Sequence, residues 1–184
     1  MSMTTTEELL ALLDYVHNRL FDRFEGMSDA EYLWEPVQGC WSVRPDADGE
    51  YHPDKHTRDP QPAPFTTIAW RLWHIGVDCL AGYSDNFFDG LAGRDRAAAG
   101  FPGTVADGLA VVDKEWARFR DHVEALDDAA LARPLGPAAG PFSEDSYHAL
   151  VLHALDEVIH HTAEIGVIRD LYRASEGGKA WVQA

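Results

Sequence analysis

Apolar residues recur at intervals of three and four positions along four long segments of the chain, and alternating apolar and polar runs are few. This spacing places apolar side chains on one face of an α-helix, so the pattern predicts a mostly helical protein. The predicted helices run from about Thr6 to Phe24, from Thr66 or Thr67 to Phe88 or Asp89, from Thr104 to about Leu126, and from near Ser143 past Tyr172 to Gly177 and Gly178.

Signals for helix ends and loops support this division. Capping-box spacing, in which a hydroxyl residue precedes a Glu by three positions, occurs in Thr4 with Glu7, Thr5 with Glu8, and Ser28 with Glu31. The stretch from Gln38 to Pro64 carries five prolines and no sustained period, which predicts a long loop. Shorter connections are expected from Gly93 to Gly103 and from Arg133 to Pro141.

The predicted fold is all-α, because four long helices joined by loops imply a four-helix bundle. A hydrophobic content of 46% in 184 residues is enough for one core of ordinary size. We therefore expect residues 1–184 to form a single helical-bundle domain.

The net negative charge and the lack of targeting signals limit the partners and the location expected for this protein. Fifteen Lys and Arg against thirty-one Asp and Glu give a formal net charge of −16, with His counted as neutral. Such a chain repels phosphate backbones and anionic lipid surfaces, so we expect neither nucleic acid nor membrane as a partner. No signal peptide or membrane span is apparent, which makes the cytoplasm the expected location. Cys40 and Cys79 lack the spacing of a metal knuckle and are expected to be reduced.

The fourth predicted helix carries ionisable residues on its apolar face. Glu157 and His161 are four residues apart and fall in the same arc as Leu150, Ala154 and Ile165. A carboxylate among apolar side chains costs several kcal/mol unless it is paired, hydrogen-bonded or bound to a metal. One reading is a simple intrahelical pair between Glu157 and His161.

A second helix supplies a third candidate ligand. His74 lies one turn after Trp70, on the face expected to point into the bundle, although a lone interior His is often only a core residue. Two imidazoles and one carboxylate suit Zn²⁺ with an open fourth position, and the same set can hold Fe²⁺, Ni²⁺ or Mn²⁺. Rival ligands or outer-shell partners on the fourth helix are His153, His160 and Glu164.

Four segments together resemble the DinB-like superfamily of metalloenzymes, and the resemblance covers almost the whole chain. They are Met27 to Pro36 (MSDAEYLWEP), Gly39 to Arg44 (GCWSVR), Thr66 to His74 (TTIAWRLWH) and Asp156 to Tyr172 (DEVIHHTAEIGVIRDLY). The resemblance implies a four-helix bundle with a divalent metal between the second and fourth helices. Many members offer a His from the second helix and a His-x-x-x-His pair from the fourth. Here Glu157 stands in the place of the first His of that pair.

With Glu at this position, the chain resembles the branch of mycothiol-dependent maleylpyruvate isomerase, which binds zinc with two His and one Glu. Carried over by position, the implied metal ligands are His74, Glu157 and His161. The implied chemistry is S-transfer, or thiol-assisted chemistry, on a small electrophile with a mycothiol-like thiol as co-substrate; relatives elsewhere use bacillithiol or glutathione. The isomerase has a further C-terminal domain, for which the twelve residues after Tyr172 leave no room, so we do not expect that particular activity.

Two other functions remain open from the sequence. A metal-dependent hydrolase could use the same three residues, with water in the open position. A non-catalytic, stress-associated bundle would contain the polar cluster only as part of its structure. A homodimer through one face of the bundle is expected from the general frequency of twofold assemblies. No catalytic residue beyond the metal ligands is indicated.

Overall fold

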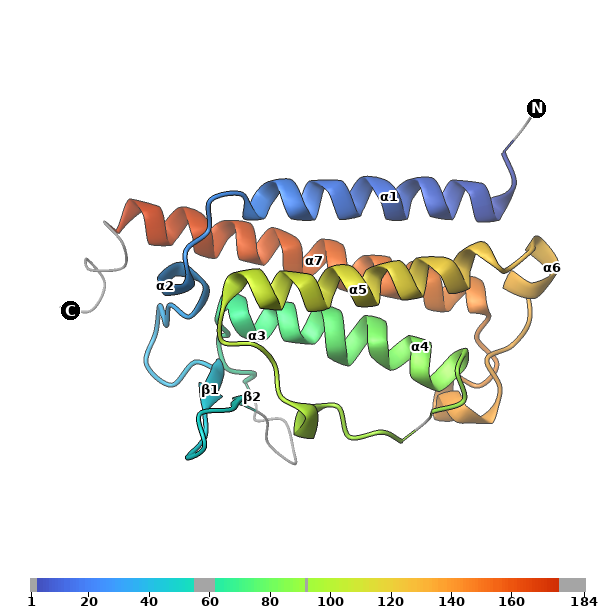
Figure 1. Cartoon of the computed structure of the whole chain (residues 1–184). Helices are drawn as coiled ribbons and strands as arrows, with labels where there is room; N and C mark the ends of the chain where they lie inside the picture. The colour runs from blue at the N-terminus through green and yellow to red at the C-terminus, as the bar shows by residue number, and fades with distance from the viewer. Residues whose placement is uncertain (1–2, 55–61, 92, 176–184) are drawn as a thin grey trace.

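Four long helices pack side by side and enclose the core (Figure 1). The computed structural model describes residues 3–54, 62–91 and 93–175. Helices α1 and α7 run in one direction, and α5 and the helix containing α3 and α4 run in the other (Figure 1). Contacts join α1 to α5 and α7, and join the α3–α4 helix to the same two helices. The predicted all-α bundle is confirmed.

Helix α1 spans Thr5–Phe24 and agrees closely with the prediction. The Thr4 hydroxyl accepts a hydrogen bond from the Glu7 amide, and the Glu7 carboxylate accepts one from the Thr4 amide, so this capping box is confirmed. Thr5 is already inside the helix. The short helix α2, Asp29–Tyr32, is capped by Ser28, but the expected return bond from Glu31 is wrong, because Glu31 pairs with Arg169 instead.

The second long helix is continuous from Ile68 to Phe87 but changes its winding on the way. It consists of α3, Ile68–Trp73, a π-helical segment, His74–Ala81, and α4, Gly82–Phe87. Thr67 caps its start by accepting a hydrogen bond from the Trp70 amide. A π-helical turn carries i→i+5 hydrogen bonds and is wound more loosely than an α-helix. The sequence period did not reveal this segment, which begins at a candidate ligand, His74.

The remaining helices are α5, Val105–Glu124, the short α6, Asp128–Leu131, and α7, Tyr147–Ala174. Thr104 caps α5 as predicted. Helix α7 begins later than the predicted start near Ser143, because Ser146 is its N-cap and accepts from the Ala149 amide. The expected end of this helix at Gly177 and Gly178 lies outside the described residues.

The long loop predicted from Gln38 to Pro64 contains a small hairpin, so the prediction of loop alone was wrong. Strands β1, Val43–Pro45, and β2, Tyr51–Pro53, pair antiparallel with Arg44 opposite His52. Each strand has only three residues and ends in a proline, which hides it from pattern analysis. Short 3₁₀ turns, Ala97–Ala99 and Pro137–Phe142, occupy the other two loops.

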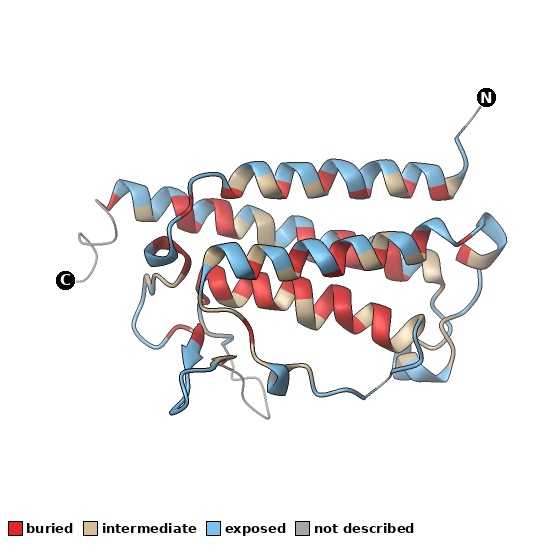
Figure 2. Cartoon of the chain, in the orientation of Figure 1, coloured by how far each residue is buried: buried red, intermediate tan, exposed pale blue. Residues whose placement is uncertain are grey.

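The buried residues lie along the inner faces of the four helices (Figure 2). Gly76 allows the π-helical segment to approach α5, because a Cβ at this position would lie 3.0 Å from Cγ2 of Val112. His74 lies two residues earlier in the same π-helical segment, which contacts both α5 and α7. Among the described residues, no helix is long and apolar enough to cross a membrane.

Candidate metal centre

The three residues predicted as ligands meet between the second long helix and α7. Nε2 of His74 lies 3.2 Å from Oε2 of Glu157, and Nε2 of His161 lies 3.3 Å from the same oxygen. The two imidazole rings stand perpendicular to each other, with centroids 4.8 Å apart. The structure therefore brings both ring nitrogens to one carboxylate oxygen, across two helices.

These two nitrogen–oxygen separations match those between neighbouring ligands of a tetrahedral metal site. Nitrogen and oxygen ligands each lie about 2.0–2.2 Å from Zn²⁺, and at the tetrahedral angle two such atoms are about 3.3 Å apart. The side chains of His74, Glu157 and His161 are 20%, 25% and 15% exposed. The expectation of a carboxylate enclosed by apolar residues was only partly right, because Glu157 lies at the rim of the core, where small molecules can reach it.

Each imidazole is held by a second carboxylate at its other nitrogen. Nδ1 of His74 lies 3.2 Å from Oδ2 of Asp78, and Nδ1 of His161 lies 2.6 Å from Oε2 of Glu164. A carboxylate at Nδ1 favours the tautomer that keeps the proton there and leaves the lone pair of Nε2 free. The lone pairs of both Nε2 atoms are thus available on the side of the rings that faces Oε2 of Glu157.

Trp70 and Arg71 position the two imidazoles from outside. The Trp70 ring stacks on His74 with centroids 5.4 Å apart and an angle of 9° between the planes. The buried guanidinium of Arg71 forms an ion pair with Glu164, and its Nη1 lies 3.3 Å from Nδ1 of His161. Arg71 therefore fixes the carboxylate that in turn orients His161.

The ionisable groups of the cluster perturb one another strongly. Burial alone lowers the pKa of His74, but hydrogen bonds and charges from Asp78 and Cys79 outweigh it and raise that pKa to about 10. Burial, with the positive charges of His74 and Arg71, lowers the pKa of His161 to about 4. Burial raises the pKa of Glu157, yet the hydrogen bond and charge of His74 lower it overall. At neutral pH one proton is therefore held on His74, between carboxylates.

This proton would set the pH dependence of metal binding at the candidate site. A cation needs the neutral imidazole, so it must displace the proton from His74, whereas His161 is already neutral above its pKa of about 4. Between pH 6 and pH 8, below the His74 pKa of about 10, affinity for Zn²⁺ should rise at least about tenfold per pH unit. Calorimetry in buffers of different ionisation enthalpy should detect release of at least about one proton.

The exposed His153 provides the control for this pH experiment. His153→Gln should keep the same slope, because the His153 ring is more than half exposed and lies 3.9 Å from Oε1 of Glu157. A zinc affinity that does not change with pH would contradict this description of the site.

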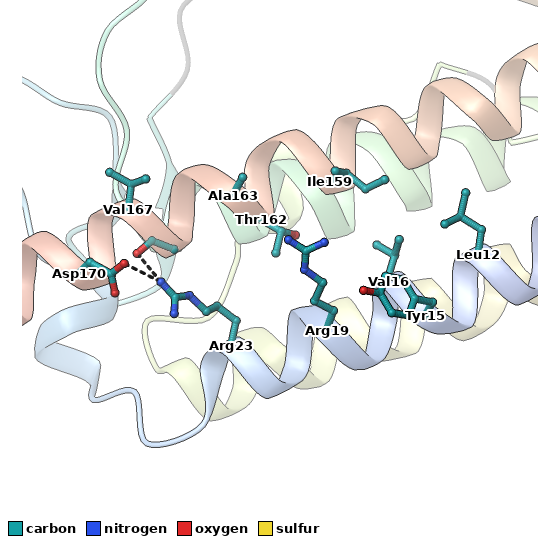
Figure 3. A pocket seen from close by; sticks show the side chains of 11 residues that line it. Leu12, Tyr15, Val16, Arg19, Arg23, Ile159, Thr162, Ala163, Val167 and Asp170 are labelled. Carbon is teal, nitrogen blue, oxygen red and sulfur yellow. Dashed lines mark hydrogen bonds and ion pairs between the residues drawn. The ribbon is translucent and has the colours of Figure 1, made fainter.

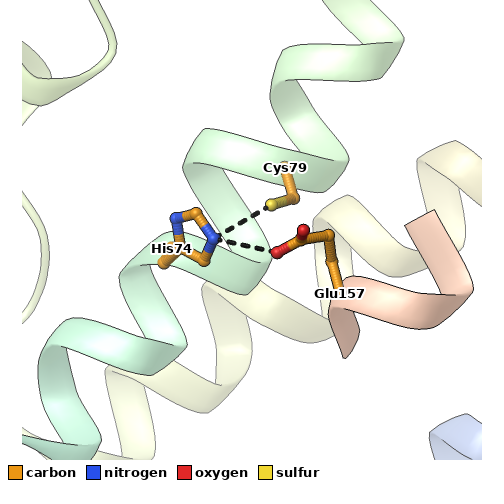
Figure 4. A group of neighbouring side chains, drawn as sticks. All are labelled: His74, Cys79 and Glu157. Atoms are coloured by element: carbon orange, nitrogen blue, oxygen red, sulfur yellow. Dashed lines mark hydrogen bonds and ion pairs between the residues drawn. The ribbon is translucent and has the colours of Figure 1, made fainter. Parts of the chain in front are cut away.

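Cys79 is a neighbour of the site that the sequence pattern did not predict. Its buried Sγ lies 3.5 Å from Nε2 of His74, and the ligand atoms of His74, Cys79 and Glu157 lie within 4.8 Å of one another (Figure 4). In an α-helix, residues five apart point about 140° away from each other. The looser π-helical winding brings Cys79 round toward His74. Only recognition of a π-helix could have exposed this five-residue spacing.

The rival residues of α7 lie farther out. Nε2 of His160 lies 3.4 Å from Oε1 of Glu164, and these two residues form a second compact group with His161. Because Glu164 approaches Nδ1 of His161, this group lies on the opposite side of the imidazole ring from Glu157. The structure thus places Glu164 and His160 as neighbours of the predicted ligand set.

Comparison with families of known proteins agrees with this fold. The family model of the DinB superfamily matches residues 12–165, which include most of α1, the long second helix, α5 and most of α7. Comparisons with curated proteins and with solved structures give no match. The matched region contains His74, Glu157, His161 and Cys79, and covers most of the sequence. The chain therefore belongs to the DinB superfamily.

Proposed function

We propose that this protein is a divalent-metal-dependent enzyme that transfers a low-molecular-weight, mycothiol-like thiol to a small electrophile. His74, Glu157 and His161 would hold the cation, for which Zn²⁺ is the first choice and Ni²⁺, Fe²⁺ and Mn²⁺ are alternatives. The supporting observation is the convergence of two Nε2 atoms on one Glu157 oxygen, at 3.2 Å and 3.3 Å.

The surrounding residues favour a metal site over a simple ion-pair cluster. An ion pair between Glu157 and one imidazole would need no further acceptors, whereas here both imidazoles are also backed by carboxylates, Asp78 and Glu164. Carboxylates at the second nitrogen of ligating imidazoles are a recurring feature of protein metal centres, where they raise ligand basicity. The stacked Trp70 ring adds an apolar wall beside His74.

Thiol chemistry follows from what such a cation supplies and from the family branch. A bound dication lowers the pKa of a coordinating thiol, which then acts as a nucleophile near neutral pH. The sulfur would attack a carbon of the electrophile, the leaving group would depart with the bonding electron pair, and the thiol proton would pass to solvent. The two-His, one-Glu set of the resembling mycothiol-dependent branch supports this choice among DinB proteins.

The proposal is tested by measuring how fast a free low-molecular-weight thiol is consumed by reaction with an alkyl halide. Zinc-loaded protein should accelerate the reaction of mycothiol, bacillithiol or glutathione with a bimane halide, and His161→Ala should abolish the acceleration. The exposed His160→Ala provides the matched control and should keep most of the rate. Rates equal to those without protein for all three thiols would contradict the proposal, and metal-dependent ester or amide hydrolysis instead would favour the hydrolase.

A further inference from the structure

We propose that Cys79 is the fourth ligand of the metal centre in the resting protein, an inference that rests on the proposed function. Its thiolate would complete a set of one sulfur, two nitrogens and one oxygen with His74, Glu157 and His161. Thiolate sulfur is among the preferred ligands of Zn²⁺. The chain would then carry an internal thiol at the position that an external thiol must reach.

The proposal is based on the position of the Cys79 sulfur atom. Zn–S distances are about 2.3 Å and Zn–N distances about 2.0–2.1 Å, so tetrahedral sulfur and nitrogen ligands lie about 3.5–3.6 Å apart. Sγ of Cys79 lies 3.5 Å from Nε2 of His74, and the Glu157 oxygen is close to both (Figure 4). The other buried cysteine, Cys40, instead faces Glu35, with Sγ 3.8 Å from Oε2.

Local structure holds this sulfur in place. Cys79 belongs to the π-helical segment, which places it beside His74 on the side facing α7. The ring of Tyr83, one turn later, packs on the His153 ring of α7, with centroids 5.9 Å apart.

A four-ligand set changes the path of the proposed reaction. Sites with four protein ligands are closed, so an external thiol gains access only when it takes the place of Cys79. The proton of the incoming thiol would pass to the departing Cys79 sulfur, which leaves the number of protons unchanged. Cys79→Ser should therefore strengthen the binding of an external thiol to the metal-loaded protein.

Cobalt spectroscopy on the reduced full-length protein tests the role of Cys79. With Co²⁺ alone and no added thiol, the wild type should show visible d–d bands and a near-ultraviolet sulfur-to-cobalt charge-transfer band. Cys79→Ser should keep the d–d bands and lose the charge-transfer band. Cys40→Ser, the matched control, should keep both.

The outcomes separate this proposal from the metal site itself. Visible cobalt bands without a charge-transfer band in the wild type would overturn the role of Cys79 and leave the three-ligand centre standing. A charge-transfer band that survives in Cys79→Ser and disappears in Cys40→Ser would also overturn it. Absence of any cobalt binding would overturn the metal centre and the role of Cys79 together.

A separate observation concerns the outer surface of α1 and α7. A groove of about 540 Å³ runs between these two helices, away from the metal centre, and its walls include Leu12, Tyr15 and Ile159 (Figure 3). These apolar side chains are exposed, Tyr15 by 61%. At one end of the groove, Arg23 donates hydrogen bonds to the Asp170 carboxylate and to the Gly166 carbonyl.

The exposed face of α1 has a symmetric order of charge and apolar groups. Glu8, Leu12, Tyr15 and Arg19 follow one another at intervals of four, three and four residues, so they share one face of the helix. An antiparallel copy centred between Leu12 and Tyr15 places Leu12 on Tyr15 and Glu8 on Arg19. Neither Glu8 nor Arg19 forms an ion pair with another residue in the part of the chain that the structure describes.

We infer that a second copy of this chain covers the groove in a twofold homodimer. Because α1 and α7 run in the same direction, a single twofold axis pairs each of these helices with its own counterpart in the second copy (Figure 1). On α7, exposed Leu152 and Val167 lie seven and eight residues on either side of Ile159, which extends the apolar symmetry. A self-complementary patch of this kind is the requirement for an isologous interface.

Light scattering and charge exchange test the dimer. The wild type should have the mass of a dimer, Arg19→Glu should become monomeric, and the exchanged pair Glu8→Arg with Arg19→Glu should restore the dimer. Lys114→Glu, an exposed charge reversal on α5, is the control and should stay dimeric. Ile159→Cys should form an intermolecular disulfide under mild oxidation. A wild type that is monomeric at all concentrations, or a dimer unaffected by Arg19→Glu and not linked through Ile159→Cys, would overturn the inference.

Discussion

Replacement of Glu157 by glutamine is expected to lower the affinity for Zn²⁺ by more than about 100-fold while the helix keeps its shape. Loss of an outer-shell partner alone typically costs about 10–100-fold in metal affinity, and this change removes the charge of a proposed ligand. The same Oε2 atom faces both imidazoles, at 3.2 Å and 3.3 Å, so its loss affects both. Competition with a chromophoric chelator measures the change.

The neighbouring Asp156 gives a matched control for this prediction. Asp156→Asn removes the same charge from α7, but its side chain is exposed, so zinc affinity should stay within about twofold of the wild type. Glu157→Gln should also make thermal stability less dependent on added metal. Unchanged affinity in Glu157→Gln would indicate that His153 or Glu164 supplies the ligand instead.

The second large effect concerns stability. Arg169 is 2% exposed and donates through Nε to Oε1 of Glu31 at 2.6 Å, with Glu31 5% exposed. The guanidinium also donates to the backbone carbonyls of Arg23 and Glu25, so it joins the end of α1, α2 and α7. Arg169→Met would leave the Glu31 carboxylate buried without its cation, at a cost of about 3–5 kcal/mol. Urea denaturation measures this loss.

Two further variants identify the cause of that loss. Arg173→Met removes an exposed cation four residues later on α7 and should change the free energy of unfolding by less than about 0.5 kcal/mol. The double variant Glu31→Gln with Arg169→Met no longer buries an unpaired charge and should recover part of the stability. A single variant Arg169→Met as stable as Arg173→Met would refute the structural role of this pair.

The helices were predictable because their burial follows the period of the sequence. Leu9, Leu13, Val16 and Leu20 of α1 are all buried, as their spacing indicates. The hairpin of β1 and β2 was not predictable, because three-residue strands contain too few positions to establish an alternating pattern. The pair of Glu31 and Arg169 also escaped prediction, since its members are 138 residues apart and Glu31 has the spacing of a helix cap.

The candidate site was predictable to the extent that it follows α-helical geometry. Glu157 and His161 share a face of α7 because they are four residues apart, and His74 follows Trp70 by the same interval. The proximity of Cys79 to His74 could not be predicted in this way, because it depends on a π-helical turn. Glu164 appeared in the sequence as the partner of His160, four residues earlier, whereas its Oε2 atom also pairs with Arg71 and with Nδ1 of His161.

Metal content tests the central claim most directly. Wild-type protein purified without an affinity-tag metal, reduced, dialysed against Zn²⁺ and freed of excess ion should contain one zinc per chain by mass spectrometry. His74→Ala and His161→Ala should each lose the metal and remain folded by circular dichroism, whereas the double variant His153→Ala with His160→Ala should retain it. A wild type without stoichiometric zinc, or folded His74→Ala and His161→Ala variants that keep it, would contradict a metal centre built on these residues.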